Sequence, residues 1–210
     1  MISPSTIKPF NDFLVRALKL GQVGRGMLVP VSQLINLKEK EGRDATFRYE
    51  DVAGHCWHSI LVAIELAPKI HARINLEHVM KMLAIHDLGE IIMGDTVWPK
   101  PKPSGIKEKD LLAQVVSGSE LAEEYKRLFH EFEECQTAEA NFATAVDRLS
   151  ACLVLLSTGD TMAPQYWKAY GITRKKAEER WKLVSSYDEF LTAYWHYLLD
   201  QIGQKIGWAS

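Results

Sequence analysis

The sequence predicts an all-α protein that folds as a single helical bundle of about six to eight helices. Apolar residues recur at helical spacing through most of the chain. Runs of alternating β-branched residues bounded by Asn-Gly or Asp-Gly turns, which would indicate hairpins, are nearly absent. The chain has 210 residues, of which 47% are hydrophobic and 25% charged, so we expect one globular domain over residues 1–210.

The N-terminal part is expected to contain one helix and then mostly loop. Gly21 ends a helical apolar stripe, whose members are Phe10, Phe13, Leu14 and Leu18. The next stretch, "GQVGRGMLVPVSQLINLKEKEGRDATFRYE", is rich in glycine and carries no strand pattern. We therefore expect loops there, with one short helix near Val31–Leu37.

The middle of the chain is expected to hold two helices and a long loop. One helix covers about Val52 to Ala67, where Pro68 lies near its end. Asn75 is a suitable N-cap for a second helix that continues to about Glu90. The stretch "GDTVWPKPKPSGIKEKD" that follows is rich in proline and predicts a loop.

The C-terminal half is also predicted to be helical. The expected elements are one or two helices over Leu111–Cys135, one over Thr137–Ser157, and one or two over Arg174–Leu199.

Composition excludes several classes of protein. A net charge of −2 and a pI near 6.4 leave no basic face for nucleic acid. Cys56, Cys135 and Cys152 are odd in number and far apart, which is typical of reduced thiols in the cytoplasm. The N-terminus shows no signal-peptide pattern, and no apolar stretch is long enough for a membrane span. We expect a cytoplasmic protein that binds neither nucleic acid nor membrane.

The stretch "LAIHDLGEIIMGD" carries polar groups on an apolar, helical segment. His86 and Asp87 are adjacent, so they project about 100° apart on a helix and can share a pocket. Glu90 follows at i+4 from His86 and can face the same cavity, and Asp95 closes the run. Taken alone, His86 and Asp87 would equally fit a satisfied core histidine and a helix-end ion pair.

Two further polar residues lie on other apolar helices. His55 sits in the preceding predicted helix at a position that should face inward. Asp147 lies within "ATAVDRLSACLVLL", and a buried unpaired carboxylate costs several kcal/mol. Arg148 is next to Asp147 but is expected to project to a different side. We therefore expect the partner of Asp147 to come from elsewhere in the fold.

Together these residues suggest a metal site. Two imidazoles and two carboxylates from three predicted helices would form it, namely His55, His86, Asp87 and Asp147. Mixed nitrogen and oxygen ligands without a thiolate favour one divalent ion, Mn²⁺, Co²⁺, Fe²⁺, Zn²⁺ or Mg²⁺.

The order of these residues, H … HD … D, resembles the HD-domain superfamily of metal-dependent phosphohydrolases. The segments "EDVAGHCWHS", "HDLGEIIMGD" and "EFEECQTAEANFATAVDRLSACL" are similar to the branch of HD-domain 5′-deoxynucleotidases. That branch shows E-x-V-x-x-H, then H-D-x-x-E-x-x-x-G-D, then a helix with the last Asp. The resemblance covers about residues 48–156, which we take as the core of the metal site.

The resemblance implies an all-α fold, a homodimer, and one catalytic metal on the four ligands. It places Glu90 and Asp95 on the family's two catalytic carboxylates. Asp95 would orient or deprotonate the attacking water, and Glu90 would support proton transfer to the leaving group, although the two roles could be exchanged. Without the motif, the two residues would read as a surface glutamate and a helix-end aspartate.

The part that contacts substrate departs from the family pattern. Members often carry an R-T-G-W-like element whose arginine binds substrate, whereas here the region reads "EGRDATFRYE", without tryptophan. Arg48, or otherwise Arg43, is the candidate for phosphate binding. The aromatic C-terminal run "YDEFLTAYWHYLLDQIG" could supply the dimer interface or belong to the core.

The function that this resemblance implies is hydrolysis of (deoxy)nucleoside 5′-monophosphates to nucleoside and phosphate. Three alternatives stay open: a cyclic nucleotide substrate, an alarmone substrate, and a non-catalytic domain that binds metal or nucleotide. His130 is the only histidine between the HD pair and Asp147, which argues against a second metal. The partner expected is a small phosphate ester.

Overall fold

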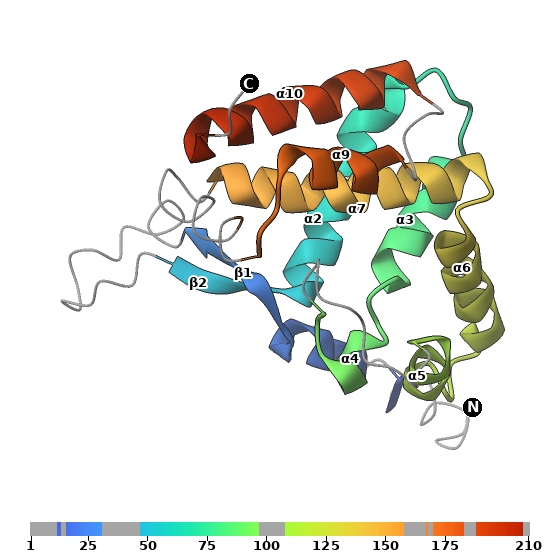
Figure 1. Cartoon of the computed structure of the whole chain (residues 1–210). Helices are drawn as coiled ribbons and strands as arrows, with labels where there is room; N and C mark the ends of the chain where they lie inside the picture. Colours follow the sequence, from blue (N-terminus) through green and yellow to red (C-terminus); the bar gives the residue numbers. More distant parts are fainter. Residues whose placement is uncertain are drawn as a thin grey trace.

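The structure is a computed structural model that describes residues 12–13, 16–30, 47–96, 108–157, 167, 170–182 and 188–207. The all-α prediction is confirmed, since helices make up most of the described residues (Figure 1). The short helix expected near Val31–Leu37 lies outside them. The helices are η1 (Leu18–Gln22), α2 (Val52–Leu66), η3 (Ala67–Lys69), α3 (Leu76–Ile85), α4 (Glu90–Met93), α5 (Glu108–Val115), α6 (Ala122–Glu134), α7 (Ala138–Ser157), α9 (Arg174–Lys182) and α10 (Glu189–Ile206).

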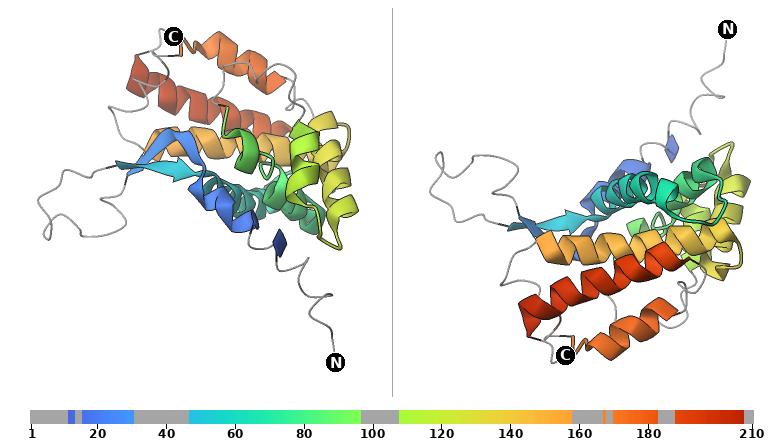
Figure 2. Two further views of the ribbon diagram at one scale, coloured as in Figure 1. Left: turned by 90° about the horizontal axis from the view of Figure 1, so that it is seen from below. Right: turned by 90° about the horizontal axis from the view of Figure 1, so that it is seen from above.

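Helix α7 is the centre of the bundle. It contacts α2, α3 and α6 on one side and α10 on the other, and the views of Figure 2 show α9 beyond α10. Phe142 and Leu149 of α7 are fully buried, as are Leu191 and Ile202 of α10. Burial of such apolar side chains is the main favourable term in folding. None of the helices in the described residues is long and apolar enough to cross a bilayer.

The helix that carries the first expected ligand begins and ends close to the predicted limits. Asp51 caps α2 by accepting a hydrogen bond from the Gly54 N–H at 2.7 Å. The helix ends at Leu66, and a 3-10 turn containing Pro68 follows. At the N-terminus, residues 12–13 and 16–17 are helical and run into η1, so the predicted helix is continued by a 3-10 turn past Gly21.

The predicted cap of α3 is confirmed, because the side chain of Asn75 accepts a hydrogen bond from the His78 N–H at 3.2 Å. The variant Asn75→Ala is expected to lower the free energy of unfolding by about 1 kcal/mol, since this helix-end N–H would lose its partner. Urea denaturation measures the change, and an unaltered midpoint would show that the cap contributes nothing.

The prediction that this helix continues to Glu90 is wrong. Helix α3 ends at Ile85, and a turn leads into the separate short helix α4. In the turn, the Leu88 N–H donates to Ile85 O and the Glu90 N–H to Asp87 O, which is the tighter 3-10 spacing. Gly89 lets this turn lie against α5, because a Cβ there would lie 3.1 Å from Cγ of Glu108.

The expectation of loops without strands before α2 is also wrong. Strands β1 (Gly24–Pro30) and β2 (Phe47–Asp51) form an antiparallel pair in which Gly24 lies opposite Asp51. A register shift between Gly24 and Leu28 interrupts the pairing. The pair ends where α2 starts, so it places β1 next to the beginning of α2.

Candidate metal centre

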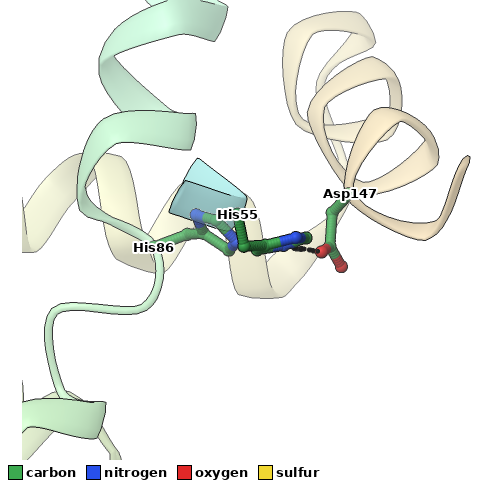
Figure 3. A group of neighbouring side chains, drawn as sticks. All are labelled: His55, His86 and Asp147. Carbon is green, nitrogen blue, oxygen red and sulfur yellow. Dashed lines mark hydrogen bonds and ion pairs between the residues drawn. The ribbon is translucent and has the colours of Figure 1, made fainter. Parts of the chain in front are cut away.

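Three of the four predicted ligands meet in the interior of the bundle. His55 comes from α2, His86 from the C-terminal end of α3, and Asp147 from α7, and their side chains point toward one another (Figure 3). One ligand atom from each lies within 4.8 Å of the others. His55 Nε2 is 2.8 Å from Asp147 Oδ1, and His86 Nε2 is 3.8 Å from the same oxygen. The expected partner of Asp147 from elsewhere in the fold is thus His55.

Asp87, the fourth predicted ligand, lies at the edge of this group. Its Oδ2 is 3.3 Å from His86 Nε2 and 3.0 Å from Nη1 of Arg25. The structure therefore places Asp87 beside one imidazole of the group and pairs it with a cation that the sequence analysis did not consider.

The hydrogen bonds of His86 fix the state of its ring. Nδ1 donates to the carbonyl of Leu83 at 3.0 Å, because a carbonyl only accepts. Nε2 is the ring atom that faces the two carboxylates. Burial acts to lower the pKa of His86, but attraction to the carboxylates of Asp87 and Asp147 outweighs it and holds that pKa well above its usual value.

Asp147 shows the complementary shift. Burial acts to raise the pKa of its carboxyl, but the hydrogen bond from His55 and attraction to His86 hold it well below the ordinary value. The carboxylate is thus charged, and the group as a whole stabilises positive charge at the point where the three side chains meet.

These residues fit a divalent metal ion. Among the described residues, the buried atom His86 Nε2 has no hydrogen-bond partner, which is costly unless a cation or proton occupies it. Neutral imidazole nitrogens and carboxylate oxygens are ligands for Zn²⁺, Mn²⁺, Co²⁺ and Fe²⁺. Cys56 is a poorer donor, because burial raises the pKa of its thiol and its Sγ faces His86 Nδ1 at 4.0 Å.

The predicted catalytic carboxylates lie in the same cleft as the metal group. The cleft has a volume of about 270 Å³ and is lined by both Glu90 and Asp95. Glu90 is 9% exposed. Burial, together with the charges of Asp87 and Asp95, raises the pKa of Glu90 to about 9, so this carboxyl binds a proton at neutral pH.

Arg25 and Glu50 are site residues to which the sequence analysis gave no role. Arg25 Nε is 3.6 Å from Glu50 Oε2, and Glu50 Oε1 is 3.9 Å from His55 Nδ1. Burial acts to lower the pKa of Arg25, but Asp87, Asp147 and other carboxylates outweigh it, so the guanidinium stays charged. Glu50 stands in the E-x-V-x-x-H motif and could have been found from it. Arg25, within "GRG", carries no such signal.

The positions of the two predicted substrate-binding side chains, Arg48 and Arg43, lie outside what the structure describes. Arg48 lies in β2 opposite Val29, but its side chain is not among the described ones, and Arg43 lies outside the described residues. Arg148, which was expected to project to a different side from Asp147, lines the cleft as well. Arg180 of α9 lines it as well.

Comparison with known proteins shows which family the chain resembles and which solved structures share its fold. The model of the HD domain family matches residues 37–185, which include all four predicted ligands. A crystal structure of a predicted metal-dependent phosphohydrolase from Magnetospirillum magnetotacticum is similar over 100% of both chains, with 28% identity and a TM-score of 0.79. A search of curated proteins found no significant match.

Two structures of proteins from Pyrococcus species share the fold. A conserved hypothetical protein from Pyrococcus furiosus matches with 19% identity and a TM-score of 0.56, over 92% of this chain and 99% of its own. A protein from Pyrococcus horikoshii matches with 21% identity and a TM-score of 0.57, over 93% of this chain and 99% of its own. At these identities the likeness concerns the fold alone.

Proposed function

The chain belongs to the HD domain family, and on that premise we propose that it is a metal-dependent phosphohydrolase. The observation that carries the proposal is that the groups needed for this reaction lie together in or beside one cleft. A buried His–His–Asp group that attracts positive charge, a protonated carboxyl at Glu90 and the guanidinium of Arg25 all line it or adjoin it. Hydrolysis of a phosphate ester needs these groups together.

In this proposal His55, His86, Asp147 and Asp87 hold one divalent ion. Such an ion, when bound, lowers the pKa of a coordinated water from about 15.7 toward 7 and polarises a phosphoryl oxygen. To hold such an ion, His86 would give up the proton that its raised pKa favours in the metal-free protein, because a ligating imidazole is neutral. Arg25 lies beside Asp87 and so can neutralise charge on the equatorial oxygens of the phosphoryl group.

The two carboxylates take different roles. The raised pKa of Glu90 supports its assignment as the acid that protonates the leaving alkoxide. Asp95 accepts the proton of the attacking water in this scheme. Burial, which favours the protonated form at Glu90, supports this division of the two roles that the sequence left exchangeable.

The proposed substrates are (deoxy)nucleoside 5′-monophosphates, supported by the similarity of the H-D-x-x-E-x-x-x-G-D run to that branch of the family. We further propose that residues 1–210 form one domain and that the protein is a cytoplasmic homodimer. Cyclic nucleotides and alarmones remain the alternative substrates, and a binding domain without turnover the alternative function.

Phosphate release by metal-stripped protein, re-supplied with Mn²⁺, Co²⁺, Mg²⁺ or Zn²⁺, tests this function. We expect release from deoxyribonucleoside 5′-monophosphates only with metal, and far less from the 3′ isomers. Cyclic nucleotides and alarmones are included as the alternatives. Binding of metal without release from any of these esters would contradict the proposal.

A further inference from the structure

Glu50 is a buried carboxylate that the mechanism above does not use. It lies in β2, five positions before His55, and is 5% exposed. A carboxylate is costly to bury unless neighbouring groups hydrogen-bond to it or carry the opposite charge. The groups around Glu50 therefore indicate what this residue does.

The two oxygens of Glu50 face two residues of the metal centre. Oε1 is 3.9 Å from Nδ1 of His55, and Oε2 is 3.6 Å from Nε of Arg25. Both distances are too long for hydrogen bonds. Among the described residues, Glu50 Oε2, His55 Nδ1 and Arg25 Nε are buried atoms without a hydrogen-bond partner. Donors and acceptor are thus adjacent, but the bonds between them are not formed.

The position of the proton on His55 accounts for the open contact at Nδ1. Nε2 lies 2.8 Å from Asp147 Oδ1 (Figure 3, dashed line) and donates to it, because an ionised carboxylate only accepts. A neutral imidazole has one N–H, so Nδ1 is then an acceptor. Nδ1 of His55 and Oε1 of Glu50 are therefore two acceptors, which cannot bond to each other.

A histidine that ligates a metal through Nε2 carries its proton on Nδ1 instead. Such histidines nearly always donate this proton to a carboxylate, a backbone carbonyl or water, which fixes the tautomer and the orientation of the ring. For His86 the acceptor is the carbonyl of Leu83. For His55 the carboxylate of Glu50 lies in the corresponding place. Glu50 therefore favours the tautomer of His55 that can ligate a metal.

Arg25 lies between two carboxylates. Its Nη1 donates to Oδ2 of Asp87 at 3.0 Å, and its Nε faces Oε2 of Glu50. Contacts at two of the three nitrogens restrict rotation of the planar guanidinium and so direct its remaining N–H groups. The oxygen that Glu50 does not offer to His55 thus orients the arginine that we assign to the phosphoryl group.

We propose that Glu50 is a positioning residue of the metal centre. One of its oxygens holds His55 in the ligating tautomer, and the other orients Arg25. This inference rests on the proposed function and adds to it a residue that links the first metal ligand to the phosphate-binding arginine.

Titration of the metal-stripped protein with Co²⁺, followed by visible absorption, tests the contact to His55. Glu50→Gln keeps the size of the side chain but removes its charge. We expect its Co²⁺ affinity to be lower by about 10- to 100-fold, and the spectrum of bound Co²⁺ to shift because the imidazole is reoriented. Glu50→Asp keeps the charge and both acceptor oxygens, so it should restore part of the affinity. Unchanged affinity and spectrum in Glu50→Gln would overturn the inference.

The proton on Nδ1 can be observed by NMR of the Zn²⁺-loaded protein labelled with ¹⁵N-histidine. The wild type should show a slowly exchanging His55 Nδ1–H that is shifted downfield by its bond to a carboxylate. Glu50→Gln should move this resonance upfield or broaden it by exchange with water. A purely structural role of Glu50 would lower the unfolding temperature of the variant and leave the resonance in place, which would contradict the inference.

Sulfate, a tetrahedral dianion that stays soluble with Zn²⁺, tests the contact to Arg25. Calorimetry should show that Zn²⁺-loaded Glu50→Gln binds sulfate roughly 10-fold more weakly than the wild type does. Equal affinities would overturn the part of the inference that concerns Arg25.

Glu131→Gln is the matched control. Glu131 of α6 also lies against an imidazole, 2.8 Å from Nε2 of His78, but it does not line the cleft. It should change neither the Co²⁺ affinity and spectrum nor the binding of sulfate. None of these measurements needs turnover. Loss of Co²⁺ affinity in Glu50→Gln alone supports the inference even if no ester is hydrolysed, and hydrolysis by wild type does not rescue it if Glu50→Gln binds Co²⁺ unchanged.

Discussion

Asp147→Asn is expected to abolish metal binding and to lower phosphate release about 10³-fold or more. Asp147 Oδ1 is the atom to which both imidazoles of the group point, at 2.8 Å from His55 and 3.8 Å from His86. An amide removes the negative charge, while the shape stays the same. Loss of several kcal/mol of charge stabilisation in the transition state corresponds to a factor of this size.

Metal content after dialysis and phosphate release under saturating metal measure the effect of Asp147→Asn. Asp200→Asn is the matched control, because Asp200 forms an ion pair with Arg174 and is not part of the cleft. Its metal content and activity should equal those of the wild type. Full metal content in Asp147→Asn would show that α7 does not supply a ligand.

Glu90→Gln is expected to have opposite effects on activity and on stability. Activity should fall about 10²- to 10⁴-fold, because an amide cannot donate the proton that the leaving alkoxide needs. At alkaline pH, the metal-stripped variant should have a higher free energy of unfolding than the metal-stripped parent. The pKa of Glu90 in the folded protein is about 9, against an ordinary value of 4.5, so the folded protein holds this proton more tightly than the unfolded chain does.

The contribution of Glu90 to the free energy of unfolding of the parent therefore falls as pH rises from about 4.5 to about 9. Over this range the unfolded chain has already released the proton, whereas the folded protein still holds it. Glutamine removes that dependence. The free energies of unfolding of parent and variant should be similar near pH 5, and the variant should be more stable by a few kcal/mol near pH 9. Urea denaturation across this range measures the difference, and parallel pH profiles would contradict the assignment of a raised pKa.

The periodicity of the sequence was sufficient to predict that His55 and Asp147 face the interior. Both lie on helices whose other inward positions are apolar, and a helix of that kind has only one face to bury. The order of His55, His86, Asp87 and Asp147 then indicated a shared centre through resemblance to a family. The structure brings His55, His86 and Asp147 within ligand distance of one another.

Arg25 could not be predicted, because its place depends on pairing between distant segments. Gly24 lies opposite Asp51 in the two-stranded sheet, and this register sets Arg25 beside Glu50 and Asp87. The segment between the two strands has no short turn motif such as Asn-Gly or Asp-Gly, so the local sequence does not predict a hairpin. The pattern that predicted a helix to Glu90 failed after Ile85, where a tight turn begins, and within that turn Gly89 lies close to Glu108.

The central claim, that His55, His86 and Asp147 hold a catalytic metal with Asp87 beside them, is tested most directly by anomalous diffraction from crystals grown with Mn²⁺. The account predicts one strong anomalous peak within about 2.0–2.3 Å of the two Nε2 atoms and of an Asp147 oxygen. A fully bound ion elsewhere, or no ion at this position under conditions that support phosphate release, would contradict it.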